Sequence, residues 1–157
     1  MIIRKATIKD LKSVQELNLL LFEKEISDYN DKTLDDNWTF SETGTKYYEN
    51  KIIDDDSFVV VAEEDGKIIG YLAGGICENH AYRKPEKMAE LENTLVLEQY
   101  RGKGIGGKLM DAFADWCNLQ KIERIRVSAS APNKKGIVFY KKNGFKEYDI
   151  ILERKLN

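Results

Sequence analysis

A glycine-rich stretch at residues 101–108 carries the side chains best suited to hold an anion. It contains four glycines and three basic residues within eight positions. Backbone N–H groups at the start of a helix lack partners inside the helix, and the helix dipole favours negative charge there. Glycines also let a phosphate approach the backbone closely. The stretch therefore predicts a phosphate-binding turn. The simpler alternative is a tight turn that needs glycine for its dihedral angles.

Two common nucleotide-binding patterns fit this stretch only in part. The dinucleotide pattern G-x-G-x-x-G begins at Gly102, but the next expected strand, residues 124–129, ends without the acidic residue that this fold requires. The P-loop pattern G-x-x-x-x-G-K begins at the same glycine. However, Leu109 stands where a Ser or Thr hydroxyl is needed to bind Mg²⁺. Both patterns are rejected on these grounds.

A third pattern, [QR]-x-x-G-x-[GA], is met in full by Arg101, Gly104 and Gly106. Downstream, residues 139–145 contain Y-x-x-x-G-F, and Asn133 lies seven residues before the tyrosine of that motif. With both motifs at this spacing, the chain resembles the GCN5-related N-acetyltransferase (GNAT) superfamily over nearly its whole length. The resemblance implies one domain over residues 1–157, acetyl-CoA as co-substrate and no metal.

The resemblance also implies which residues contact acetyl-CoA. The glycine turn would hold the pyrophosphate, the backbone of the preceding strand would hold the pantetheine arm and the acetyl carbonyl, and Asn133 would lie near that arm. The implied contacts are Leu95, Val96, Leu97, Arg101, Gly102, Lys103, Gly104, Ile105, Gly106, Gly107, Asn133 and Tyr140.

Three side chains are candidates for proton transfer. Tyr140 is the candidate general acid toward the departing thiolate, because a phenol stays protonated at neutral pH. Glu90 and Glu92 are candidates for the base. On a regular strand they would share a face about 7 Å apart, and their repulsion would raise the pKa of one. Ordered water alone is the alternative base. His80, in a polar loop, is expected to be a surface residue.

The charge of the chain is unevenly distributed. Residues 23–65 hold 14 acidic and 4 basic side chains, a net charge of −10, whereas residues 101–157 hold 6 acidic and 13 basic side chains, a net charge of +7. Acids and aromatic rings alternate in the first region, which favours a cationic acceptor such as a polyamine, an aminoglycoside, a lysine side chain or a basic peptide terminus. The alternative is an acidic loop with core aromatics. The residues are Glu23, Glu25, Asp28, Asp31, Asp35, Asp36 and Glu42, with Tyr29, Trp38, Phe40, Tyr47 and Tyr48.

The function implied is an N-acetyltransferase that moves an acetyl group to a primary amine by direct attack in a ternary complex. The competing functions are a noncatalytic acyl-CoA-binding sensor or partner module, and an enzyme that uses another acyl group. A homodimer paired through the late strands is also left open.

The expected fold is a single-domain α/β structure, with a mixed, mostly antiparallel sheet of six to seven strands and about four helices. Met88 to Leu97 alternates as a strand, with Ala89, Leu91, Asn93, Leu95 and Leu97 on one face. Strands are expected at 2–7, 57–62, 67–73, 88–97 and 124–129, with one or two more in 145–156. Asp65-Gly66 predicts a type I′ hairpin turn that joins the strands at 57–62 and 67–73. Helices are expected at 8–22, 45–53, from 105 and from 133, with an irregular loop or short helices at 23–43.

Composition excludes several other classes of protein. The chain has 157 residues, 42% of them hydrophobic, a net charge of −2, two cysteines and one histidine. These numbers argue against a disulfide framework, a metal cluster and a general nucleic-acid binder. No apolar run approaches the roughly 20 residues that span a bilayer, and the first residues do not read as a signal peptide. A cytoplasmic protein is therefore expected.

Overall fold

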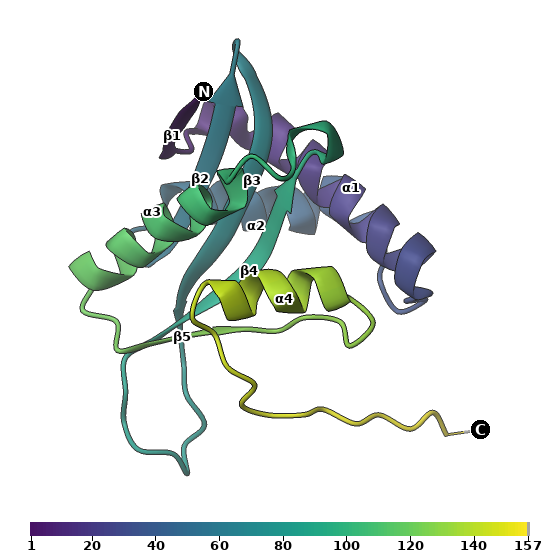
Figure 1. Cartoon of the computed structure of the whole chain (residues 1–157), viewed down its shortest axis with the longest axis vertical. Helices are drawn as coiled ribbons and strands as arrows, with labels where there is room; N and C mark the ends of the chain where they lie inside the picture. Colours follow the sequence, from purple (N-terminus) through teal and green to yellow (C-terminus); the bar gives the residue numbers. More distant parts are fainter. Residues whose placement is uncertain (157) are drawn as a thin grey trace.

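The computed structural model describes residues 1–156 and contains one five-stranded sheet with helices on both faces (Figure 1). The elements in chain order are β1 Ile2–Lys5, α1 Leu11–Tyr29, α2 Glu42–Ile53, β2 Ser57–Glu64, β3 Lys67–Cys77, β4 Met88–Val96, α3 Ile105–Leu119, β5 Arg124–Val127 and α4 Lys134–Lys142. Short 3-10 turns occupy Ile8–Asp10, Trp38–Phe40 and Glu98–Tyr100. Within the described residues, no helix is both long and apolar enough to cross a bilayer.

The strands lie in the sheet in their order along the chain. Pairs β1–β2, β2–β3 and β3–β4 are antiparallel, and β4–β5 is parallel. Asp65 and Gly66 join β2 to β3, and both have positive φ values of 51° and 76°, as the predicted type I′ hairpin turn requires. The expected mixed, mostly antiparallel α/β fold is confirmed.

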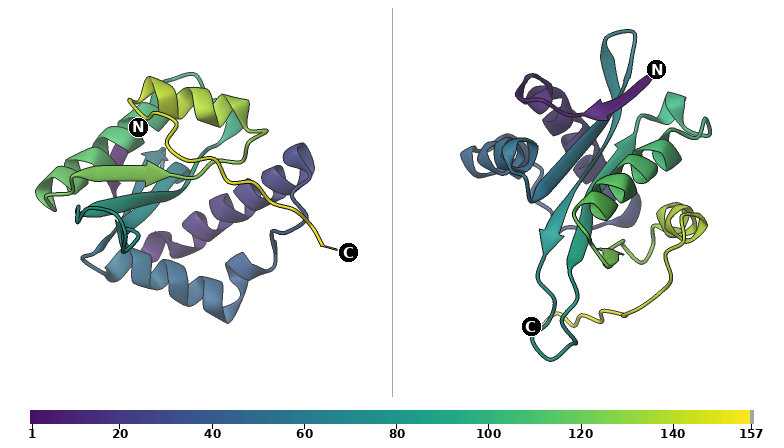
Figure 2. Two further views of the ribbon diagram at one scale, coloured as in Figure 1. Left: turned by 90° about the horizontal axis from the view of Figure 1, so that it is seen from below. Right: turned by 90° about the vertical axis from the view of Figure 1, so that its left-hand side faces the viewer.

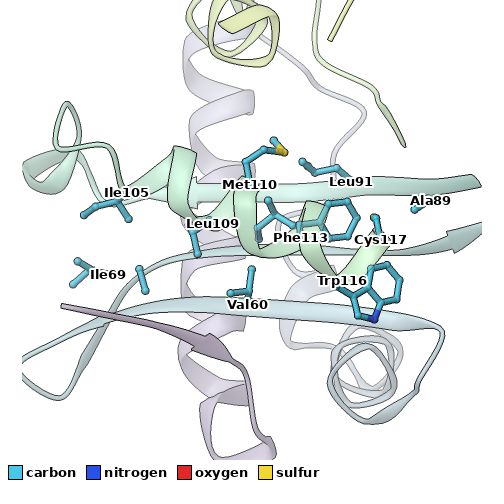
Figure 3. Close-up of a cluster of buried hydrophobic side chains, with 12 residues drawn as sticks. Val60, Ile69, Ala89, Leu91, Ile105, Leu109, Met110, Phe113, Trp116 and Cys117 are labelled. Atoms are coloured by element: carbon cyan, nitrogen blue, oxygen red, sulfur yellow. The ribbon is translucent and has the colours of Figure 1, made fainter. Parts of the chain in front are cut away.

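The sheet separates two hydrophobic clusters. The first lies under α3, whose Leu109, Phe113 and Trp116 point onto the strands (Figure 3). Cys117 belongs to this cluster and is buried. The second cluster lies under α1 and α2 and contains Tyr48. Figure 2 shows α3 and α4 on one face of the sheet and α1 and α2 on the other.

A β-bulge in β4 overturns the predicted facing of its side chains. Ala73 pairs with Asn93 but Gly74 pairs with Leu91, so Glu92 is an extra residue in the ladder. Leu91 therefore packs in the first cluster while Leu95 packs in the second. The expectation that Leu91 and Leu95 share a face was wrong, because simple alternation fails across an inserted residue.

The end of the chain also departs from expectation. Residues 145–156 contain no strand, so the sheet has five strands rather than six or seven. Part of the region predicted as loop or short helices, residues 23–29, extends α1 instead. Residues 23–29 are mostly polar, so a prediction that relies on the spacing of apolar residues does not detect a helix there.

Asp10 fixes the start of α1 to the edge of the sheet. Arg4 donates two hydrogen bonds of 2.8 Å to its carboxylate, and the Thr7 N–H donates a third of 2.8 Å. These donors hold the pKa of Asp10 well below its ordinary value. A carboxylate with a lowered pKa contributes stability above its unfolded pKa, and this contribution is lost as the pH falls.

We therefore expect Asp10→Asn to lower the free energy of unfolding by about 1–3 kcal/mol at pH 7. The difference from the parent chain should shrink between pH 5 and pH 3, since the unfolded carboxyl group titrates near pH 4. Urea denaturation of both chains at pH 5 and at pH 3 measures this difference in the free energy of unfolding. A difference that stays constant with pH would mean that the charge of Asp10 is not the stabilising feature.

Candidate functional site

The glycine turn leads directly into α3 and exposes the start of that helix. Gly102 and Gly104 both have φ of 77°, a left-handed conformation that favours glycine. The first intrahelical bond runs from the Lys108 N–H to the Gly104 carbonyl, so the preceding N–H groups have no partner within α3. Ile105 is buried in the first cluster and anchors the turn. The result is an exposed, positively charged helix start that is suited to an anion.

The strand before this turn has an open edge. Pairing between β4 and β5 covers only Met88–Leu91 and Arg124–Val127, so within residues 1–156 the second half of β4 has no strand beside it on that side. The Leu97 N–H donates to Ile69 on β3, and the backbone groups of Val96, one residue earlier, point the opposite way. The Val96 carbonyl accepts a 2.8 Å hydrogen bond from Arg101 Nε. Backbone groups on β4 and the glycine turn thus face one region.

Helix α4 brings the second motif against the first. A Cβ atom added to Gly106 would lie 3.0 Å from the ring of Phe139, so the first turn of α3 packs closely on α4. The requirement for a small residue at position 106 therefore comes from helix packing. This contact joins two motifs that are more than 30 residues apart in the sequence.

Tyr140 lies on α4 between two other rings. Its ring centroid is 5.4 Å from that of Phe139 and 5.8 Å from that of Phe145, both with edge-on geometry. Burial, with a smaller contribution from the charge of Glu25, raises the pKa of Tyr140 to about 12. The phenol is therefore a proton donor throughout the neutral range.

Asn133 has a structural role at the start of α4. Its Oδ1 accepts from the Gly136 N–H at 2.9 Å, which caps α4, and from the Tyr29 hydroxyl at 3.0 Å. Ser130, in the same loop, donates to Glu25. The last turns of α1 thus contact the loop between β5 and α4. This contact was not predicted from the sequence, because its partners are more than 100 residues apart.

Glu90 and Glu92 each have a cationic partner. Arg126 Nη2 lies 2.9 Å from Glu90, and Lys51 Nζ lies 2.5 Å from Glu92, which also accepts from the Tyr47 hydroxyl. Burial and this contact hold the pKa of Tyr47 above its ordinary value. The sequence predicted repulsion between the two carboxylates. It did not identify the cationic side chains that pair with them.

The acidic and aromatic residues of 23–48 do not converge on one point. Trp38 packs against the second cluster, in which Tyr48 is fully buried. Asp28 pairs with Lys24 within α1, and Glu42 pairs with Lys46 within α2. Of the acids in this stretch, Glu25 lies close enough to Tyr140 for its charge to raise the pKa of that phenol.

His80 lies apart from the glycine turn. It is exposed in the loop between β3 and β4 and stacks on Tyr82, with ring centroids 5.3 Å apart. That loop projects from the opposite end of the sheet (Figure 1). The structure is thus consistent with the surface role predicted for His80.

Comparison with known proteins was made by sequence and by structure. The model of the family described as "Acetyltransferase (GNAT) family" matches residues 17–145. An uncharacterized N-acetyltransferase of Methanocaldococcus jannaschii is 30% identical over 100 residues, which are 62% of this chain and 42% of that protein. An N-alpha-acetyltransferase of Sulfurisphaera tokodaii is 32% identical over 96 residues, which are 58% of each chain. The matches thus span about half the length of these relatives.

Solved structures share the fold at lower identity. An aminoglycoside N-acetyltransferase in complex with CoA superposes with a TM-score of 0.75. It is 19% identical, and the match covers 99% of this chain and 100% of that one. At this identity the likeness establishes the fold alone.

Proposed function

The chain belongs to the acetyltransferase (GNAT) family, and we propose that it moves an acetyl group from acetyl-CoA to a primary amine by direct attack in a ternary complex. The observation that carries the proposal is the position of the exposed start of α3 beside the open edge of β4, with Tyr140 held on α4. In this proposal residues 1–157 act as one domain. Two free cysteines support a reducing, cytoplasmic setting.

The residues of the turn fit the pyrophosphate of acetyl-CoA. The N–H groups of Ile105, Gly106 and Gly107, which have no partner within α3, offer hydrogen bonds, and Arg101 and Lys103 offer positive charge. Backbone groups of Leu95, Val96 and Leu97 would orient the pantetheine arm and donate to the thioester oxygen as charge develops on it. Acetyl-CoA, when bound, supplies the thioester that the amine attacks.

Side chains of this site would carry out two proton transfers. Tyr140 would give its proton to the departing sulfur, and its raised pKa keeps the phenol in the protonated form at neutral pH. Glu92 would accept the proton of the incoming ammonium group through water, with Lys51 and Tyr47 fixing its carboxylate. Glu90 remains the alternative base.

We expect Glu92→Gln to lower kcat/KM by about 10-fold to 100-fold, because the amide cannot take a proton. Glu49→Gln, at a half-buried position on α2, is the control and should keep the parent rate. Initial rates with a fixed amine, measured from pH 6 to pH 9, test this. A loss with Glu90→Gln in place of Glu92→Gln would transfer the role to Glu90.

The acceptor is proposed to be cationic. Glu25 near Tyr140 and the net charge of −10 over residues 23–65 support this choice. The similar aminoglycoside N-acetyltransferase agrees with a polyamine-like or amino-sugar acceptor, and the N-alpha-acetyltransferase relative agrees with a peptide terminus.

A noncatalytic acyl-CoA-binding module is the second candidate. The ion pairs that neutralise Glu90 and Glu92 are the observation that favours it, since a structural carboxylate has the same partners. Such a module would keep the glycine turn and bind the same ligand without transferring its acyl group.

Isothermal titration with acetyl-CoA tests the part common to both candidates. We expect micromolar binding, with no heat from NAD⁺ or ATP–Mg²⁺ as controls. Absence of acetyl-CoA binding would overturn both functions.

A further inference from the structure

The side-chain amide of Asn133 is held in one orientation by two hydrogen-bond donors. Its Oδ1 accepts from the backbone N–H of Gly136 at 2.9 Å and from the hydroxyl of Tyr29 at 3.0 Å. A backbone N–H can only donate, so the amide atom that faces it must be the oxygen. The chemistry of the contact therefore fixes which way the amide is turned and leaves Nδ2 as its free end.

A glycine makes the space in which this amide lies. A Cβ atom added to Gly136 would lie 2.6 Å from Nδ2 and 2.8 Å from Oδ1 of Asn133. These distances are shorter than van der Waals contact, so a larger residue at position 136 would displace the amide. Glycine is unfavourable within a helix such as α4, and here it preserves the position of the Asn133 side chain.

Capping of α4 explains only one half of the Asn133 side chain. A helix cap needs an oxygen that accepts from the first turn, and Ser, Thr or Asp supplies that oxygen equally well. Nδ2 of Asn133 donates to no group within residues 1–156, although the residue is half-buried. A half-buried amide whose donor end is unpaired is suited to a ligand that brings an acceptor.

Helix α1 reaches this amide from the open edge of β4. It contacts β4, and its last turns contact the loop between β5 and α4. Glu25, one turn before Tyr29, accepts from the Ser130 hydroxyl in that loop. Figures 1 and 2 show the end of α1 beside the same loop. The helix thus joins the open edge of β4 to the loop that carries Asn133.

We propose that Tyr29 is a positioning residue for acetyl-CoA, because its hydroxyl holds Oδ1 of Asn133 and so presents Nδ2 to an amide carbonyl of the pantetheine arm. Tyr29 has this role only if the proposed function holds, since that function places the arm near Asn133. An amide that is already turned toward the ligand loses little conformational freedom on binding. Without the hydroxyl, only the Gly136 N–H holds the amide. Tyr29 therefore acts on acetyl-CoA affinity without touching the ligand.

A double-mutant cycle on acetyl-CoA binding tests the proposal. Tyr29→Phe removes the hydroxyl, and Asn133→Ser removes the amide but keeps an oxygen that can cap α4. We expect either change to raise the dissociation constant measured by isothermal titration by about 3-fold to 10-fold. In the Asn133→Ser chain, Tyr29→Phe should add less than about 2-fold, because the group through which it acts is gone. Tyr82→Phe, at an exposed position, is the matched control and should bind like the parent.

The outcomes of this cycle separate the positioning role from the proposed function. Parent-like binding by Tyr29→Phe, or effects that add in the double variant, would overturn the role of Tyr29 and leave the proposed function standing. A bond that only ties α1 to the loop would lower the urea midpoint of Tyr29→Phe without changing its acetyl-CoA affinity. Absence of binding by the parent chain would overturn the proposed function itself.

Nuclear magnetic resonance identifies Nδ2 as the donor. In a ¹⁵N-labelled chain, the side-chain NH2 signals of Asn133 are recognised by their absence from Asn133→Ser. We expect these signals to shift when acetyl-CoA is added. Signals that stay in place while acetyl-CoA binds would contradict a hydrogen bond from Nδ2 to the pantetheine arm.

Discussion

Gly104→Glu is expected to abolish measurable acetyl-CoA binding. Gly104 directly precedes α3 with φ of 77°, where a side chain is strained, and the first N–H groups of α3 have no partner within the helix. The glutamate would add negative charge and bulk at this position, which reverses the favourable electrostatics of the helix start. We expect the dissociation constant measured by isothermal titration to rise by at least 100-fold.

A matched control separates the loss of binding from the strain of the substitution. Gly66→Glu places the same residue at nearly the same φ, 76°, in the turn between β2 and β3. That turn is the tip of the β2–β3 hairpin, which projects beyond the end of the sheet (Figure 1). A Cβ atom at Gly66 would meet no other atom within 4 Å, so the control should bind acetyl-CoA like the parent chain. Normal binding by Gly104→Glu would show that the turn is not the pyrophosphate site.

Tyr140→Phe is expected to lower kcat between about 10-fold and 1,000-fold with little change in acetyl-CoA affinity. The phenylalanine keeps the ring contacts with Phe139 and Phe145 but removes the proton that the departing sulfur would take. Tyr82→Phe, in the exposed loop near His80, is the control. A parent-like kcat for Tyr140→Phe would remove this residue from the mechanism.

The pH dependence of this effect follows from the pKa of Tyr140. Because the pKa is raised to about 12, the donor form persists as the pH rises through the neutral and mildly alkaline range. The ratio of the parent rate to the Tyr140→Phe rate should therefore stay constant from pH 7 to pH 10. A ratio that falls by pH 9 would indicate an ordinary or lowered pKa and a different donor.

The sequence was sufficient to predict the features that depend on local spacing. The helix start after the glycine turn, the hairpin at Asp65-Gly66 and the short helix opening at Asn133 were each predicted from residues a few positions apart, and the structure has them. Local signals of this kind depend on backbone conformation, which nearby residues decide.

Features that depend on distant partners could not be predicted in the same way. The bulge at Glu92 follows from the fit of β4 against β3, and it changes which side chains share a face. Lys51 and Tyr47 meet Glu92 only because α2 packs over the sheet. The segment 145–156 has the composition of a strand, but a strand also needs a neighbour to pair with.

Amine-dependent release of CoA tests the proposed acetyl transfer most directly. The full chain is incubated with acetyl-CoA, and free thiol is followed with and without polyamines, amino sugars, lysine derivatives and peptide N-termini. We predict release that depends on the amine, follows saturation kinetics and is accompanied by an N-acetylated product in the mass spectrum. Tight binding of acetyl-CoA without release of CoA for any amine would contradict the proposed N-acetyltransferase activity. The noncatalytic acyl-CoA-binding module would then be the remaining candidate.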